Sequence, residues 1–174
     1  MPEPKRNRPA GNGAAPKTSG QDTRKGSAPD PLETLTATAH AAEAAVLGAM
    51  LLSPDAAAGV PAMLDADAFH RDAHRTVYAA VLALIADGIA PDTLTVTDRL
   101  ATRGQLDHVG GPLAVADLTD MATCPTPASW PAYATVVARE ARRRRGVRLL
   151  SDALARLHAG EDPATVAEDL AVAV

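Results

Sequence analysis

The chain has 174 residues, of which 47% are hydrophobic and 2% aromatic, and its net charge is −4. This length suits one ordinary domain that buries roughly two-thirds of its unfolded surface, and it excludes a second full domain. The negative charge excludes a global attraction to nucleic acid or to an acidic membrane, and a single cysteine, Cys124, excludes an internal disulfide and a multi-cysteine metal site.

The N-terminal segment, residues 1–38, is rich in Pro, Gly, Ser, Lys and Arg and carries few large apolar side chains. Such a segment cannot bury enough surface to offset its ordering entropy, so we expect a disordered, mildly basic tail. It serves either as a solubilising tail or as a nonspecific phosphate-binding arm. It lacks the apolar core of a signal peptide, and no run elsewhere reaches the ~20 apolar residues of a membrane span, so we expect a cytoplasmic protein with no membrane contact.

Apolar residues at helical spacing begin near His40. Val46, Leu47, Met50 and Leu51 fall within one arc of a helix, which Ser53-Pro54 ends. A short helix from Asp55 to Leu64 should follow, interrupted at Pro61, and residues 65–70 should form a connection.

Three further helices are expected in the middle of the chain. The first carries Val77 to Ile85 and is closed by Asp87-Gly88 in a left-handed cap. The second opens at Thr95-x-x-Asp98, which resembles a capping box, and Gly104 ends it. The third follows the turn at Gly110-Gly111, with Pro112 at its first position. Its expected apolar anchors are Leu113, Val115 and Leu118.

The C-terminal part predicts two helices. After a non-helical stretch at residues 123–127, one helix runs from about Ser129 to His158 and is ended by Gly160, and Asp162-Pro163 caps the last one. No segment alternates as a strand would. The predicted fold is therefore all-α: an orthogonal small bundle of about five to six helices over residues 39–128, followed by a helical hairpin over residues 129–174.

Several motifs occur in a recognisable order. They are Glu43 to Leu52 (EAAVLGAMLL), Phe69 to Arg75, Gly104-Gln105-Leu106-Asp107, Val109-Gly110-Gly111, Pro125-Thr126, Tyr133-Ala134 and Val136-Val137. Together they resemble the N-terminal collar domain of the DnaB-type replicative helicases, a module that normally precedes a RecA-like ATPase. The chain departs from this pattern at Ser129, where the family commonly has Asn, and at Arg142 and Arg143, where it commonly has apolar residues.

The resemblance implies a role in assembly. Collars of this family self-associate through their hairpins and dock primase and helicase loaders, so we expect a homodimer or higher oligomer, with a replicative helicase, primase or loader as partner. The association surface that the resemblance implies consists of Trp130, Tyr133, Val137, Arg143, Val147, Leu150, Leu154, Leu157, Val166 and Leu170. The arginines at positions 142 and 143 alter that surface, which leaves a partner other than a second copy as an alternative.

No Gly-x-x-x-x-Gly-Lys-Ser/Thr motif, which would hold nucleotide phosphates, occurs in the chain. Its lysines are Lys5, Lys17 and Lys25, all in the expected tail. We therefore expect a collar that stands alone, is not an enzyme and needs no cofactor.

Two features have a chemical and a structural interpretation. His70 and His74 have the i, i+4 spacing of zinc ligands, but the residues between them lack the Glu of a metalloprotease motif, so we expect a structural or surface role and no metal. Cys124 has no histidine base beside it in the sequence and is expected to be a small apolar filler.

The run Arg142 to Arg145 fans around a helix at 100° per residue. Arg143 falls within the apolar stripe, whereas Arg142, Arg145, Arg148 and Arg156 share one side that Asp152 can partly neutralise. This side is interpreted as a solvated, ion-paired face, with contacts to phosphate or to an acidic partner by Arg142, Arg145 and Arg148 as the alternative.

Other functions remain open at this point. The chain could be a nucleic-acid-binding adaptor that uses the basic tail and the arginine-rich helix, although few aromatics are available for base stacking and such binding would be weak or indirect. It could also be a subunit of a split replicative helicase, or a competitor that caps a complete one.

Overall fold

The computed structural model describes Met1, residues 31–122 and residues 127–173. The described residues form helices and no strand, as predicted. The α-helices are α1 (Pro31–Leu52), α2 (Pro54–Gly59), α3 (Asp72–Ala86), α4 (Thr93–Thr102), α5 (Gly111–Ala122), α6 (Trp130–His158) and α7 (Pro163–Ala173), and short 3₁₀ helices are η1 (Val60–Ala62), η2 (Ala66–Ala68) and η3 (Pro127–Ser129). No single described helix is long and apolar enough to cross a membrane; the bent pair Thr38–Leu52 and Pro54–Ala62 passes only when its two parts are taken together, by length and composition.

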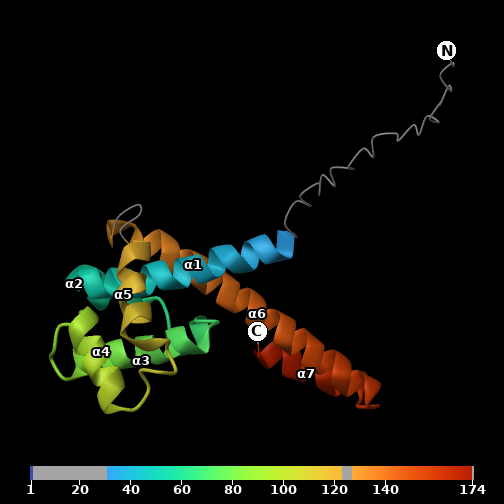
Figure 1. Ribbon diagram of the computed structural model, residues 1–174. Helices are drawn as coiled ribbons and strands as arrows, with labels where there is room; N and C mark the ends of the chain where they lie inside the picture. Colours follow the sequence, from blue (N-terminus) through green and yellow to red (C-terminus); the bar gives the residue numbers. More distant parts are fainter. Residues whose placement is uncertain (2–30, 123–126, 174) are drawn as a thin grey trace.

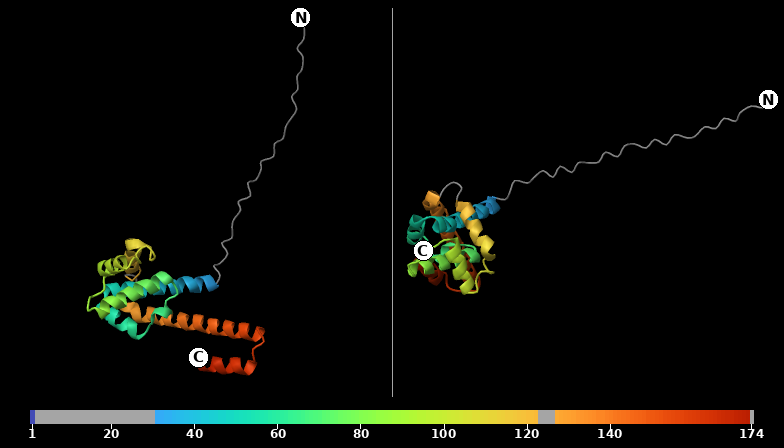
Figure 2. Two further views of the ribbon diagram at one scale, coloured as in Figure 1. Left: turned by 90° about the horizontal axis from the view of Figure 1, so that it is seen from below. Right: turned by 60° about the vertical axis from the view of Figure 1, so that its left-hand side comes forward.

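The helices are arranged in two parts. In Figure 1, α1 to α5 and the start of α6 gather at one end, while the rest of α6 runs away from them and α7 folds back beside it. Figure 2 shows the same two antiparallel helices from below. We call residues 31–122 and 127–145 the head, and residues 146–173 the hairpin.

The first helix is longer than the sequence suggested. It begins at Pro31, and a proline fits the first turn of a helix because its missing N–H would have no intrahelical partner there. The boundary expected at residue 38 therefore lies inside α1, and residues 2–30 of the expected tail lie outside the described residues. The helix ends at Leu52 as predicted, because Ser53 turns extended and caps α2.

The core of the head is built around α1. Val46, Leu47 and Met50 are fully buried, and the largest buried side chains outside α1 are Tyr78 and Phe69, whose rings lie 4.8 Å apart. The Tyr78 hydroxyl donates a 2.7 Å hydrogen bond to the carbonyl of Leu64, so this polar end is satisfied inside the core.

The turns are partly as predicted. Gly88, Gly104 and Gly110 have φ of 74°, 66° and 97°, the left-handed conformation that the turns after α3 and α4 and before α5 require. Other details differ.

The capping box of α4 is formed by Asp92 and Thr95, so the prediction of Thr95 and Asp98 was wrong: Asp92 is extended and its carboxylate accepts the Thr95 N–H at 2.7 Å. In α5, Val115 and Leu118 are buried, but Leu113 is 73% exposed because Val115 and Leu118 set the buried side of the helix. The connection at residues 65–70 contains η2, and Cys124 lies outside the described residues.

Candidate interaction surface

The clearest exposed apolar feature is on α6. Val147, Leu150, Leu154 and Leu157 are 55%, 65%, 56% and 41% exposed. Their spacing of three, four and three residues is that of the seam of a coiled coil, in which such residues face a partner helix. We call these four residues the leucine stripe.

Arg143 lies in line with the leucine stripe, four residues before Val147, as the sequence predicted. Its Nε donates a 2.8 Å hydrogen bond to Glu140, whose carboxylate also lies 3.4 Å from Arg139. The hydrogen bond from Arg143 holds the pKa of Glu140 below its ordinary value. Arg143 thus brings an ion pair, not an apolar contact, to the head end of the stripe.

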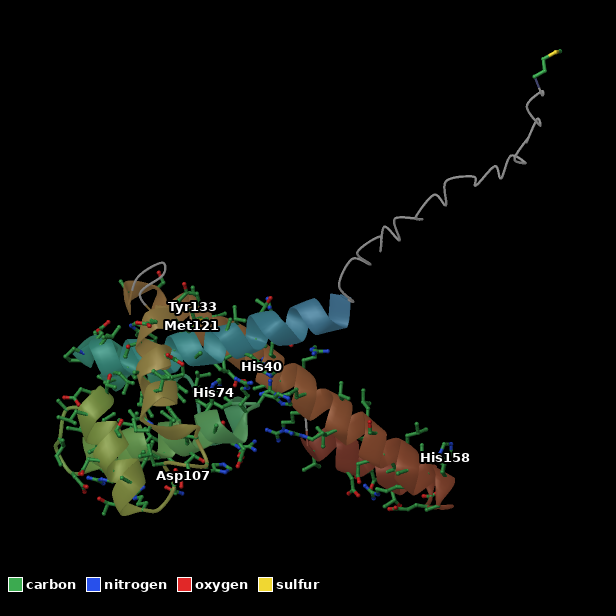
Figure 3. The ribbon with its side chains drawn as sticks, viewed as in Figure 1. His40, His74, Asp107, Met121, Tyr133 and His158 are labelled. Atoms are coloured by element: carbon green, nitrogen blue, oxygen red, sulfur yellow. The ribbon has the colours of Figure 1, made fainter. Side chains whose placement is uncertain are left out.

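Three apolar members of the expected association surface lie in the head instead. Val137 is fully buried, and Trp130 and Tyr133 pack against the core. The Trp130 indole N–H donates to Asp55 at 3.2 Å, and its ring lies against Gly59. Figure 3 shows Tyr133 beside α1, whereas His158 lies at the far end of the hairpin. The physical reason is that the first turns of α6 belong to the head. The apolar face of α6 in these turns is therefore buried against the core of the head.

Two other members hold the hairpin together. Val166 of α7 is 2% exposed and Leu170 is half-buried, while Ala153 is buried on α6. These side chains close the hairpin and are not part of its free surface. A small residue at 153 allows the close approach of two helices that have few large side chains between them.

The ion pairs of the hairpin differ from those predicted. Arg156 binds Glu161 in the turn and Asp169 on α7, the latter at 2.6 Å. Among the described residues Asp152 forms no ion pair with Arg148 or Arg156. Because the turn and α7 fold back over Arg156, carboxylates five and thirteen residues away replace the i, i+4 neighbour.

The three arginines singled out as candidate contacts lie together. Arg142, Arg145 and Arg148 line one groove of about 370 Å³ between α6 and the segment that leads to η2. The rest of its lining is Met63, Leu64, Asp65, Asp67, Ala68, Ala138 and Ala141.

A buried polar cluster in the head was not predicted. The carboxylate of Glu43 is 1% exposed and accepts hydrogen bonds from the His70 N–H at 2.6 Å and the Arg71 N–H at 3.4 Å, and it lies 2.8 Å from His74 Nδ1. Figure 3 shows His74 on α3, facing α1. The rings of His40 and His70 stack at 5.2 Å. The one signal in the sequence was a glutamate inside an alanine-rich apolar run; its partners lie about thirty residues away and no spacing rule names them.

The same cluster settles the positions of the two histidines with zinc-ligand spacing. His74 is buried against Glu43, whereas His70 is exposed and stacks on His40. Within the described part of the chain no three His, Cys, Asp or Glu side chains are grouped as a metal ion would need.

Comparisons with known proteins point to one family. The family model described as the DnaB-like helicase N terminal domain matches residues 36–139. The replicative DNA helicase DnaB of Mycobacterium leprae is 41% identical over 128 residues, which are 74% of this chain and 21% of that protein. The replicative DNA helicase DnaC of Bacillus subtilis is 40% identical over 108 residues, 62% of this chain and 23% of that protein.

A solved structure agrees with these matches. The crystal structure of the N-terminal domain of DnaB helicase from Mycobacterium tuberculosis superposes with a TM-score of 0.71 at 38% identity, covering 76% of this chain and 94% of that one. The chain thus spans about a fifth of the length of the curated relatives it matches, and nearly all of a solved N-terminal domain.

Proposed function

Because the chain belongs to the family of DnaB-like helicase N-terminal domains, we propose that it is a noncatalytic protein-interaction and oligomerisation module associated with DNA replication. It acts in the cytoplasm, assembles as a homodimer or higher oligomer through its hairpin, and contacts a replicative helicase, primase or helicase loader. The catalytic activity of the full-length relatives is not assigned to it.

The observation that carries the proposal is the leucine stripe. Four large apolar side chains at coiled-coil spacing are exposed on α6, and α7 does not cover them. Exposed apolar residues scattered singly are normal on a protein, whereas an aligned row on one helix is typical of an interface. Because each leucine is about half exposed, its burial against a partner helix would contribute about 0.8–1.5 kcal/mol.

The test is the oligomeric state of two matched variants. Leu150→Glu with Leu154→Glu places two charges on the stripe and should weaken self-association about a hundredfold, since about 1.4 kcal/mol corresponds to tenfold. The control is Leu94→Glu with Leu113→Glu, two leucines of the head that are 78% and 73% exposed. Sedimentation velocity should give a dimer or larger species for the wild type and the control, and a monomer for the stripe variant.

Two results would count against this proposal. A wild-type chain that stays monomeric at tens of micromolar and binds neither helicase nor primase would overturn it. Equal association by the stripe variant and the wild type would show that another surface carries assembly. In a helicase assay, stimulation by the chain indicates a subunit of a split helicase, and inhibition indicates a competitor.

A further inference from the structure

The run of four arginines divides into two pairs with different surroundings. Arg143 is bound to Glu140 at 2.8 Å, and Arg144 donates a 2.6 Å hydrogen bond to the carbonyl of Ala68. Burial lowers the pKa of Arg144 from its ordinary value. These two guanidinium groups are used inside the head. The other two, Arg142 and Arg145, line the groove described above.

Arg148 completes a row along that groove. Arg142, Arg145 and Arg148 are three residues apart, so they follow one side of α6. Neither Arg142 nor Arg148 forms an ion pair with another described residue. At 3.6 residues per turn this row lies roughly 160° around α6 from the leucine stripe. The two features therefore face different directions and can be tested separately.

We propose that this groove, the arginine groove, binds an acidic segment of a partner protein. A guanidinium group is planar and always charged, and its parallel N–H donors match the two oxygens of a carboxylate. Arg142 and Arg148, six residues apart along one side of α6, match carboxylates that are spaced along an extended or helical peptide. The groove is a binding site distinct from the surface on which self-association is proposed.

The apolar part of the groove lining favours a peptide over a phosphate-rich ligand. Leu64, Ala138 and Ala141 make part of the lining apolar, and Met63 is 44% exposed beside them. Asp65 and Asp67 also line the groove and oppose any anion, but they oppose the dense charge of a polyphosphate more than carboxylates that are spaced along a peptide. A peptide can place its carboxylates along α6 and an apolar side chain against the apolar lining.

Nucleic acid fits this groove less well. Its lining contains no aromatic side chain on which a base could stack. The chain as a whole is negative, with a charge of −4, so no global attraction to nucleic acid adds to contacts in the groove.

The probe is a fluorescein-labelled synthetic peptide in which glutamates are separated by alanine and leucine, and its matched control replaces every glutamate by glutamine. Fluorescence anisotropy at low salt should show binding of the glutamate peptide to the full chain, and binding should weaken as salt is added because the contacts are partly exposed. A labelled oligothymidylate and inorganic phosphate serve as the competing ligand classes.

Three variants locate the site. Arg142→Gln with Arg148→Gln should weaken binding of the glutamate peptide about tenfold, since each exposed pair contributes up to about fivefold. Arg142→Lys with Arg148→Lys should retain part of the affinity, because charge remains but the planar fork is lost. Arg103→Gln, an exposed arginine of the head outside the groove, should leave affinity unchanged. Circular dichroism establishes that each variant is folded.

Absence of binding to the glutamate peptide, equal binding of the glutamine peptide, or an equal effect of Arg103→Gln would overturn the proposal. Tighter binding of oligothymidylate or phosphate, with the same sensitivity to Arg142 and Arg148, would also overturn it in favour of a phosphate site. The leucine-stripe variant should bind the peptide like the wild type, so failure of self-association and failure of this groove are distinguishable.

Discussion

At the scale of single residues, two glycines on long helices differ in how much space a side chain would have. A Cβ at Gly48 on α1 would overlap the carbonyl oxygen of Leu118 on α5, well under 3.0 Å away, whereas a Cβ at Gly146 on α6 would meet nothing within 4 Å. Gly48 is therefore required by the close approach of two helix backbones. Gly146 has no such constraint.

Gly48→Ala should destabilise the chain by about 1–3 kcal/mol, because the added methyl group forces α1 and α5 apart in a packed core. Gly146→Ala is the matched control and should raise the free energy of unfolding by up to about 1 kcal/mol, because alanine favours the helix. Urea unfolding followed by circular dichroism measures both. Equal effects of the two substitutions would contradict the packing that places α5 on α1.

Glu43 is the buried charge on which the local fold of the head depends. Burial by itself raises the pKa of Glu43, but hydrogen bonds from His74 and from the His70 and Arg71 N–H groups outweigh it, so the pKa lies below its ordinary value of 4.5. A carboxyl whose pKa is depressed in the folded state stabilises that state above the unfolded pKa. This contribution is lost as the pH falls through the lower, folded-state pKa.

Glu43→Gln should cost about 1–3 kcal/mol at pH 7, because an amide cannot accept all the hydrogen bonds of the carboxylate. The difference between variant and wild type should narrow as the pH falls below 4.5, where the wild type loses the same contribution. Thermal unfolding at several pH values measures this, with Glu168→Gln on the exposed side of α7 as control. A difference that does not change with pH would contradict the role given to the charge.

At the scale of helices, the start of α4 shows what local sequence could and could not predict. The existence of the helix followed from the buried pair Val96 and Leu100 and from Gly104 after its end. The first residue of the helix could not be predicted in this way, because two overlapping sequences, Asp92-x-x-Thr95 and Thr95-x-x-Asp98, both resemble a capping box. Only the backbone decides between them, since the capping residue must be extended, as Asp92 is with φ −144°.

Asp92→Ala should destabilise the chain by about 1 kcal/mol through loss of this cap, while Asp98→Ala in the same helix should be nearly neutral. Hydrogen exchange of the amides in the first turn of α4 provides the local readout and should speed up only for Asp92→Ala. If Asp98→Ala destabilised the chain more than Asp92→Ala, the structure would be contradicted and the capping box Thr95-x-x-Asp98 expected from the sequence would be supported.

The candidate sites were predictable to a similar degree. Helical periodicity identified the leucine stripe and the shared side of Arg142, Arg145 and Arg148, because one helix fixes their relative angles. It did not reveal that Trp130, Tyr133 and Val137 belong to the head, or that Arg156 reaches Asp169. Those outcomes depend on which neighbour covers each part of α6, and that is a property of the tertiary fold.

At the scale of the whole molecule, the head and the hairpin differ in how they are stabilised. The head has a core of many fully buried side chains, whereas Ala153 and Val166 are the buried residues among the described positions of the hairpin. The free energy needed to open a region locally increases with the number of its buried apolar contacts, so the hairpin should open at a lower free energy than the head.

Val166→Ala should therefore open α7 without changing the unfolding of the head. The loss of two methyl groups from a buried site costs about 1–2.5 kcal/mol locally, and Val172→Ala, at a 90% exposed position, is the control. Exchange of the α7 amides should increase for Val166→Ala alone. Fluorescence of Trp130, the single tryptophan and a reporter of the head, should keep its denaturation midpoint. A shifted midpoint would mean that the two parts unfold together.

The continuity of α6 has a mechanical consequence. Its 29 residues form one unbroken helix, roughly 44 Å long at about 1.5 Å per residue. The first half of α6 packs in the head, and the leucine stripe lies on the half that projects from it. The arginine groove lies near the point where α6 leaves the head, so a change in the angle of α6 would pivot there. A tilt of about 10° there would move the far end of the arm, roughly 20 Å beyond Arg145 at about 1.5 Å per residue, by roughly 3.5 Å. A small change in how the head packs against α6 would therefore shift the leucine stripe by a few ångströms relative to the head.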